Sequence, residues 1–214
     1  MNRLLAALLL MLAWPSAGSA ARDLPYGPTL SFAVYRNGEQ IGQHTLTFRR
    51  NGPELTVDVS IDFAVKFLGF TAYRYSHQAR EVWADDALQS LAAQTDDNGR
   101  KHVVRARRDP DGLAVEHDGR RDVLPANLLP SSHWNVHQVE QSTILNTQLG
   151  IPARVTIVPV GREMVRTSSG AVPATRYRYT GDVTKDQWFD DRGRWVKTTF
   201  KASDGSTIEY ILQE

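Results

Sequence analysis

The sequence predicts an all-β protein with minor helix, a strongly curved antiparallel meander or half-barrel with a short helical or irregular insertion over its concave face. Apolar and polar residues alternate over many short segments, and turn-forming pairs separate these segments at hairpin spacing. No region alternates strands with long helices, as a parallel sheet would require. Sheets of many long strands curl rather than stay flat, which predicts the curvature.

The predicted turns are Asx-Gly pairs, whose residues tolerate the positive φ angles of tight hairpins. The pairs are Asn37-Gly38, Asn51-Gly52, Asn98-Gly99, Asp111-Gly112, Asp118-Gly119 and Asp204-Gly205. The alternation is clearest after the second pair, where Val57 and Val59 share one face and Asp58 takes the other. An antiparallel sheet commonly has one face exposed to solvent, as this alternation indicates. Strands are predicted at 30–36, 44–50, 55–66, 71–83, 88–95, 102–108, 113–117, 153–159, 175–180, 186–190, 195–202 and 207–212.

Residues 124–149 interrupt the alternation. Pro125 and Pro130 make the start of this insertion irregular, and a short helix is expected to follow, with Ser131 or Ser132 as its N-cap. The residues expected on the apolar side of that helix are Trp134, His137 and Ile144 or Leu145. Because the insertion is long enough to cross the sheet, we expect it to form a lid or plug over the concave face.

The N-terminus has the pattern of a secretory signal peptide. Arg3 precedes an apolar run at residues 4–12, and small residues lead to Ala20 and Ala21. The run is far shorter than the ~20 residues that span a bilayer, so no transmembrane anchor is expected. We therefore expect a signal peptide over residues 1–20 and a periplasmic location for the cleaved protein.

The predicted mature chain, residues 21–214, is one antiparallel β domain, since about 190 residues suffice for a single hydrophobic core. The absence of cysteine excludes disulfides, thiolate metal ligands, a cysteine nucleophile and a lipidated cysteine. Loss of Arg3 lowers the 25 basic residues to 24, which equals the number of acidic residues. The densest basic group, Arg105, Arg107 and Arg108, alternates on a predicted strand, so no nucleic-acid partner is expected.

No catalytic or metal-binding signature is complete. His133 and His137 have a spacing that places two imidazoles on one helix face, but no third ligand is identifiable and no metal is expected. Acidic turns at 96–99 and 190–193 lack the spacing of a calcium loop. The sequence contains no G-x-S-x-G, no S-x-x-K, no phosphate loop and no dinucleotide fingerprint. We therefore assign no catalytic residue and expect no cofactor.

The candidate ligand-binding residues come from the strand at 71–83 and from the insertion. Inward-facing aromatic residues of this strand either fill a core or line a hollow for an amphipathic ligand. Glu81 shares their face and needs a buried partner. In the insertion, Trp134 is the largest apolar side chain and the expected plug. The candidate site consists of Tyr73, Tyr75, Glu81, Trp83, Ser131, Trp134 and Asn135.

The hairpin predicted at 65–70 has an unusual tip. Phe67, Leu68 and Phe70 make it apolar, whereas turns are normally polar. Such a tip either tucks under the end of the sheet or forms an exposed patch for a partner or a membrane surface. We expect it to tuck under the sheet.

Short motifs along the chain resemble an uncharacterised family of exported Gram-negative proteins. They are GEQIG at 38–42, KFLG at 66–69, YRY at 73–75, EVW at 81–83, PSSHWN at 130–135, YRYTG at 177–181, WFD at 188–190, GRWVK at 193–197, DGS at 204–206 and EYIL at 209–212. The resemblance covers essentially the whole mature chain and implies a periplasmic location but no activity. More distantly, the layout is similar to Lol-type lipoprotein carriers, whose helix-capped half-barrels can hold acyl chains. That similarity implies a hydrophobic ligand by analogy.

Three functions stay open. The first is a non-catalytic periplasmic binding or chaperone-like protein for an apolar or amphipathic envelope ligand, such as a lipid or a lipoprotein-like molecule. The second is an envelope scaffold or interaction protein with a filled core, a protein partner and no ligand. The third is a hydrolase of unknown type. An apolar hollow favours the first, a solid core the second, and a polar cleft joining Glu81, His133 and His137 the third.

We predict that export removes the signal peptide. Protein recovered from the periplasm of a Gram-negative host should begin at Ala21 or Arg22 in N-terminal sequencing, because small residues precede both cleavage points at the −1 and −3 positions. A membrane-bound product that keeps Met1 contradicts the prediction.

Overall fold

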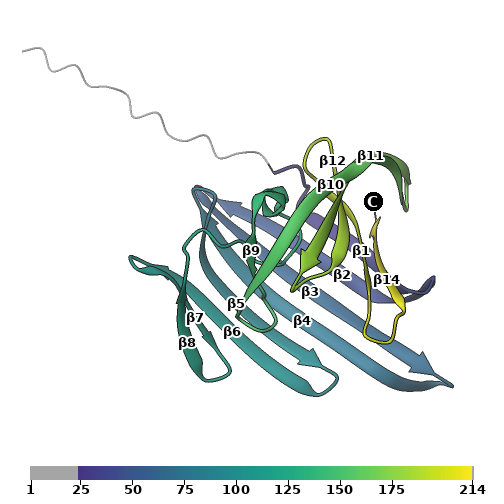
Figure 1. Ribbon diagram of the computed structural model, residues 1–214, viewed down its shortest axis with the longest axis horizontal. Coiled ribbons are helices and arrows are strands. Elements are labelled where there is room, and N and C mark those ends of the chain that lie inside the picture. The colour runs from purple at the N-terminus through teal and green to yellow at the C-terminus, as the bar shows by residue number, and fades with distance from the viewer. Residues whose placement is uncertain (1–23, 214) are drawn as a thin grey trace, which may run out of the picture.

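A computed structural model describes residues 24–213, which form a single curved antiparallel sheet of 14 strands that does not close on itself (Figure 1). The all-β class and the curved antiparallel arrangement predicted from the sequence are confirmed. The predicted signal peptide lies outside the described residues. Within residues 24–213, no helix is long and apolar enough to cross a membrane.

The sheet consists of two meanders joined side by side. The first contains β1 (Thr29–Arg36), β2 (Glu39–Asn51), β3 (Glu54–Phe67), β4 (Phe70–Ala84), β5 (Ala87–Asp97), β6 (Arg100–Asp109), β7 (Gly112–His117) and β8 (Arg120–Leu124). The second contains β9 (Thr143–Leu145), β10 (Pro152–Thr167), β11 (Gly170–Gly181), β12 (Lys185–Asp190), β13 (Trp195–Lys201) and β14 (Thr207–Gln213). The spatial order is β8-β7-β6-β5-β4-β3-β2-β1-β14-β13-β12-β11-β10-β9, so only β1 and β14 pair without being consecutive.

The Asx-Gly pairs all connect consecutive strands, as predicted. Asn37, Asn98 and Asp118 have φ angles of 48°, 52° and 44°, and the glycine after each also has a positive φ angle. Two consecutive residues of this conformation form the turn whose twist matches that of the flanking strands. These local turns therefore set the register of the hairpins.

Several strands are longer than the sequence pattern predicts. β10 continues to Thr167 and β11 begins at Gly170, although the sequence predicts no strand within residues 160–174, and it does not predict β8 and β9 either. Residues 158–164 of β10 are exposed on both faces. A strand that buries neither face has no alternation of apolar and polar residues, so periodicity does not detect it.

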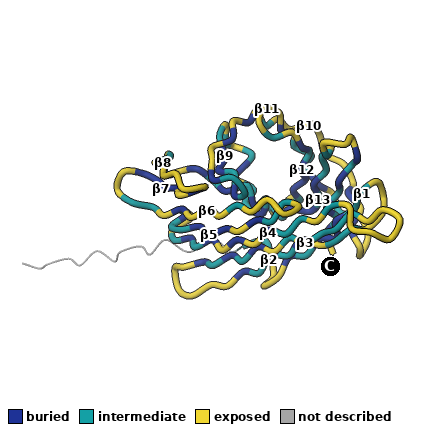
Figure 2. Tube along the Cα trace, turned by 90° about the horizontal axis from the view of Figure 1, so that it is seen from below, coloured by how far each residue is buried: buried dark blue, intermediate teal, exposed yellow. Residues whose placement is uncertain are grey.

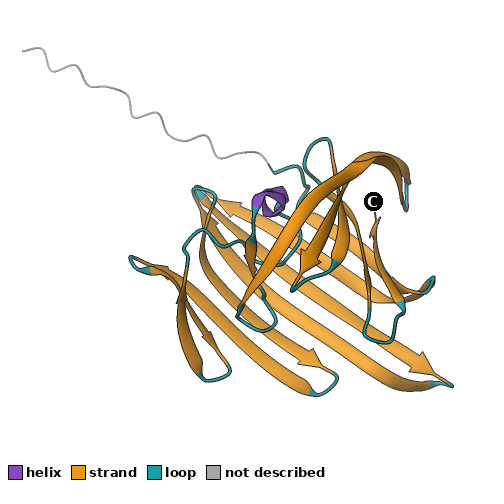
Figure 3. Cartoon of the chain, in the orientation of Figure 1, coloured by secondary structure: helices purple, strands orange, loops and turns teal. Residues whose placement is uncertain are grey.

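The connection between the two meanders, residues 125–142, is irregular as predicted, but its helix differs from the prediction (Figure 3). The only helical element among the described residues is a short 3-10 helix, η1 (Val136–Glu140), whose N-cap is Asn135 rather than Ser131 or Ser132. The Ser131 N–H instead donates to the Leu145 carbonyl oxygen at 2.9 Å, so this part of the connection runs extended beside β9. Ile144 and Leu145 lie in β9 and not on a helix.

The hydrophobic core lies where the second meander curls back over the first. In both views β9–β12 lie over the concave side of β3–β5, and the connection lies between these layers (Figures 1 and 2). Phe32 of β1 stacks on Trp195 of β13 with ring centroids 3.8 Å apart, and both are almost completely buried. The predicted insertion therefore does lie over the concave face, but β10–β12, which were not expected there, cover it in turn.

The hairpin of β3 and β4 projects beyond its neighbours. β2 pairs with β3 only as far as Phe63, and β5 pairs with β4 only as far as Tyr75. Residues 64–74 therefore form a two-stranded arm (Figure 1, lower right). At its tip Phe67, Leu68 and Phe70 are 69%, 81% and 79% exposed, so the prediction that the tip tucks under the sheet is wrong.

We predict that Gly42→Ala destabilises the fold by about 1–3 kcal/mol, because an added methyl group overlaps the carbonyl oxygen of Asp62 and the Cβ atom of Phe63. Gly27→Ala is the matched control, since a Cβ atom there has no neighbour within 4 Å. Urea unfolding should show a lower midpoint for Gly42→Ala and a change within about 0.5 kcal/mol for the control. Equal midpoints contradict the close approach of β2 and β3.

Candidate functional site

Glu81 lies on the concave face of β4 and is fully buried. Its Oε2 atom accepts hydrogen bonds from Nε1 of Trp83 at 2.9 Å and from Nε1 of Trp134 at 3.0 Å. Trp83 belongs to the same strand and Trp134 to the connection, so this carboxyl group fastens the connection to the sheet. Burial raises the pKa of Glu81 above its usual value, and the side chains of Ser132, Trp134 and Trp83 oppose that rise.

Trp134 fills the space over β4 and is only 5% exposed. Its ring packs edge-on against Trp83 and Phe48, with centroid distances of 5.3 Å and 5.7 Å. Its carbonyl oxygen accepts a hydrogen bond from the Tyr26 hydroxyl group, which in turn accepts one from the Trp195 N–H at 3.0 Å. The predicted plug is therefore a core residue fixed through both its indole and its backbone.

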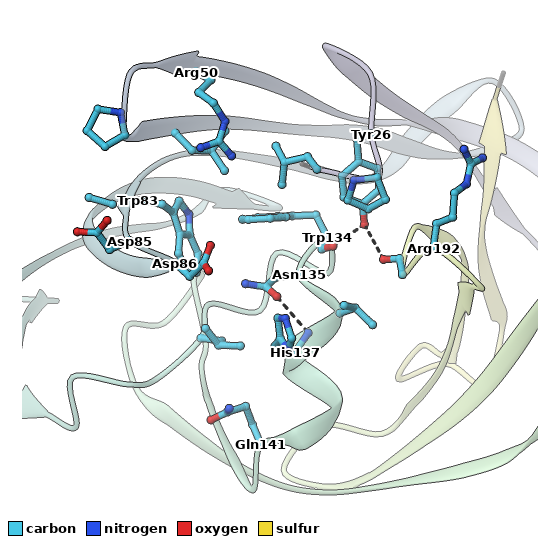
Figure 4. A pocket seen from close by; sticks show the side chains of 18 residues that line it. Tyr26, Arg50, Trp83, Asp85, Asp86, Trp134, Asn135, His137, Gln141 and Arg192 are labelled. Atoms are coloured by element: carbon cyan, nitrogen blue, oxygen red, sulfur yellow. Dashed lines mark hydrogen bonds between the residues drawn. The ribbon is translucent and has the colours of Figure 1, made fainter. Parts of the chain in front are cut away.

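A pocket of about 610 Å³ lies beside the two indoles, where the β2–β3 and β4–β5 turns meet the connection (Figure 4). We call it the strand-end pocket. Trp83, Trp134 and Leu129 contribute apolar wall, and Asn135 and Gln141 contribute amide groups. Besides the Tyr26 hydroxyl group, the charged or titratable residues that line it are Arg50, Asp85, Asp86, His137 and Arg192. The pocket thus combines an apolar wall with a rim that carries both signs of charge.

Four of the seven predicted site residues come together at this end of the sheet. Trp83, Trp134 and Asn135 line the pocket, and Glu81 holds the two indoles from the core side. The Asn135 side chain also caps η1, since its Oδ1 accepts the His137 N–H at 3.0 Å. One cluster therefore contains residues from both the strand and the insertion.

The other three predicted residues lie toward the opposite end of β4. The Tyr75 hydroxyl donates to Gln148 Oε1 at 3.0 Å, and the Tyr73 hydroxyl donates to an Asp97 carboxylate oxygen at 2.5 Å. Ser131 Oγ lies 3.2 Å from Thr147 Oγ1. Residues ten apart on an extended strand are separated by about 33 Å, so sharing a face does not bring Tyr73 close to Trp83.

A buried polar cluster that the sequence analysis did not assign lies between β2, β12 and the connection. Nζ of Lys185 is 2.7 Å from Nδ1 of His133 and 4.4 Å from the centroid of the Tyr179 ring. Gln187 Nε2 donates to the His133 carbonyl oxygen at 2.8 Å. His133 has a φ angle of 73°, in the left-handed region that non-glycine residues rarely adopt. The sequence does contain one indication of this cluster. Lys185 alternates in phase with Gln187 and Phe189, so a lysine shares the inward face of its strand.

These buried groups favour their neutral forms. Burial lowers the pKa of Lys185 well below its usual value, and burial together with nearby Lys185 lowers the pKa of His133. Burial lowers the pKa of His44 to about 3, and neither of its ring nitrogens has a hydrogen-bond partner among residues 24–213. The concave side thus has an uncharged polar centre rather than a set of ion pairs.

Glu81, His133 and His137, which a catalytic polar cleft would have to join, contact different partners among residues 24–213. Glu81 contacts two indoles, His133 contacts Lys185, and His137 at the pocket rim has its Nδ1 atom 3.4 Å from Glu140 Oε1. The residues that line the strand-end pocket do not include Lys185. In the described part of the chain, no three His, Asp or Glu side chains are placed to hold a metal ion.

We predict that stability falls in acid because of the buried histidines. Burial lowers the pKa of His44 to about 3 and that of His77 to about 4, from the usual 6.5. Unfolding lets both side chains take up protons, so their stabilising effect is complete above pH 6.5 and is lost as the pH falls toward 4. Each contributes a slope of about 1.4 kcal/mol per pH unit in this range. The raised pKa of Glu81 acts in the opposite direction.

Urea unfolding of His44→Leu between pH 4 and pH 7 tests whether His44 contributes to this loss of stability in acid. This variant should show a shallower acid slope than the wild type. Parallel curves for His44→Leu and the wild type contradict the role given to His44.

Comparison with known proteins places the fold but no activity. Residues 32–213 match a family described as a domain of unknown function, DUF6134. No curated protein matches the chain significantly. A crystal structure described as a beta-barrel-like protein of domain of unknown function DUF1849, from Brucella abortus, has a TM-score of 0.61 at 10% identity and is matched over 87% of this chain and 95% of that chain. The expected resemblance to an uncharacterised family is confirmed: the chain belongs to the DUF6134 family.

Proposed function

We propose that this protein is a non-catalytic binding protein that holds a small amphipathic ligand in the strand-end pocket. The observation that carries the proposal is a pocket of about 610 Å³ with Trp83 and Trp134 in its wall and charged side chains at its rim. Small-molecule sites commonly have volumes of about 300–1,000 Å³, an apolar lining and a few orienting polar groups. The apolar body of the ligand packs against the indole wall, and its polar group faces the rim.

Hydrogen bonds hold the wall of the strand-end pocket in place, which favours ligand binding without rearrangement of the wall. Glu81 fixes both indoles through their N–H groups, and Tyr26 fixes the backbone of Trp134. A wall that is already ordered loses little conformational entropy when a ligand binds. Both signs of charge at the rim, with Asp85 and Arg192 as examples, suit a zwitterionic or uncharged polar head group better than a strongly charged one.

The proposed ligand class is an envelope lipid or a lipoprotein-like molecule, and the proposed location is the periplasm. The signal-peptide pattern at residues 1–20 supports the location. The similarity of layout to Lol-type carriers supports an apolar ligand by analogy alone. Trp134 is packed into the core on the concave side, so the proposed ligand lies outside it, in the pocket at the ends of the strands.

A second candidate function is an envelope interaction protein that binds no ligand. The filled core favours it, because Trp134, Trp195 and Phe32 leave the concave face without an apolar hollow. Under this alternative, the strand-end pocket is a surface depression and the partner-binding surface lies elsewhere.

The two candidates predict different uptake of an amphipathic probe, the fluorescent fatty acid 11-(dansylamino)undecanoic acid. Wild-type protein should bind it saturably at one site. Ala84 lines the pocket, so the side chain introduced by Ala84→Phe should fill it and weaken affinity at least about tenfold. Ala92→Phe is the matched control, because Ala92 is exposed on the outer face of β5.

Fluorescence titration of the three proteins decides between the candidates. Loss of binding in Ala84→Phe, with retention in Ala92→Phe, supports the pocket. No uptake by wild-type protein, or equal uptake by both variants, contradicts it and favours the interaction protein. Trp134→Ala is a poor pocket variant, because removal of this packed side chain costs about 3–5 kcal/mol of stability.

A further inference from the structure

The arm at residues 64–74 is a self-contained hairpin. Phe67 pairs with Phe70 across a two-residue turn, in which Leu68 and Gly69 have φ angles of 49° and 84°. The backbone groups of the tip therefore pair with each other. Behind the tip, the outer edges of the arm pair with no strand of the described sheet, apart from hydrogen bonds between Arg74 and Asn98.

The tip presents a continuous apolar surface to solvent. Phe67, Leu68 and Phe70 are 69%, 81% and 79% exposed, which leaves each side chain open in several directions. A rigid protein surface covers only one side of such a hairpin. The interface of a lipid bilayer surrounds whatever enters it, so it covers the whole tip.

The charge of the arm fits the same partner. Its eleven residues include two basic side chains, Lys66 and Arg74, and no acidic one. Lys66 lies two residues before Leu68, about 7 Å behind the tip at the usual rise of a strand. Apolar groups of peripheral proteins enter a bilayer by about 5–10 Å, so Lys66 reaches the head groups when the tip is inserted. Basic residues at this level are attracted to anionic lipids.

We propose that the arm is a membrane-contact element that inserts its tip into the interface of an anionic phospholipid bilayer. Because the tip pairs its own backbone groups, insertion takes no unpaired strand edge into the apolar layer. The unpaired edges of residues 64–66 and 71–74 remain among the polar head groups. The strand-end pocket lies at the other end of β3 and β4, roughly 40 Å away at 3.3 Å per residue, and faces away from the bilayer.

The absence of native cysteine allows a position-specific test in the full chain. Leu68→Cys places a label at the tip, and Met164→Cys places one at a 64% exposed apolar position on β10. Each variant carries the environment-sensitive dye NBD and is mixed with vesicles of phosphatidylcholine and phosphatidylglycerol. Both variants keep the apolar N-terminal segment, so adsorption through that segment affects them alike.

Insertion predicts a blue shift and a roughly twofold or greater rise in NBD emission at Leu68→Cys, with neither change at Met164→Cys. Adding Phe70→Ser to Leu68→Cys should weaken vesicle affinity at least about tenfold. Vesicles of phosphatidylcholine alone should give a weaker response, because they lack the anionic head groups. The absence of a response at Leu68→Cys, or an equal response at both positions, overturns the proposal. A protein is then the partner that covers the tip.

Discussion

The buried carboxyl group of Glu81 is the constraint on which the rest of the concave side depends. It needs donors inside the protein, and its Oε2 atom receives two, the indole N–H groups of Trp83 on the same strand and of Trp134 on the connection. Trp134 reaches this position only when the connection folds back across the sheet. The same interaction therefore fills the core and gives the strand-end pocket its wall. Loss of one donor leaves a buried oxygen less well paired, which costs more than an ordinary hydrogen bond contributes.

Much of the fold could be predicted because its determinants are local. Asx-Gly pairs specify turns within a few residues, and strands such as β3 bury one face, so alternation marks them. The outer half of β10 buries neither face and has no such mark. The prediction of a helix starting at Ser131 is wrong for another reason. This backbone pairs with Leu145 of β9 and is held extended, and capping rules consider only residues that are close in the sequence.

The candidate site was predictable only along one strand. Alternation placed Glu81 and Trp83 on the inward face, and the need of a buried carboxyl group for donors pointed to residues of the insertion. Tyr73 and Tyr75 share that face but lie far along the strand from the pocket. Alternation indicates the face of a residue and not its position along the strand. The contact between Lys185 and His133 joins segments far apart in the chain, and no spacing rule connects them.

The seam between β1 and β14 has a consequence for the order of folding. All other neighbouring strands are consecutive in the chain, so hairpins can form each meander separately from contacts of short sequence separation. The seam pairs residues from opposite ends of the domain, such as Val34 with Tyr210, and therefore carries the largest loop-closure entropy. We therefore expect formation of this one ladder to be the slow step that joins the two meanders into one sheet.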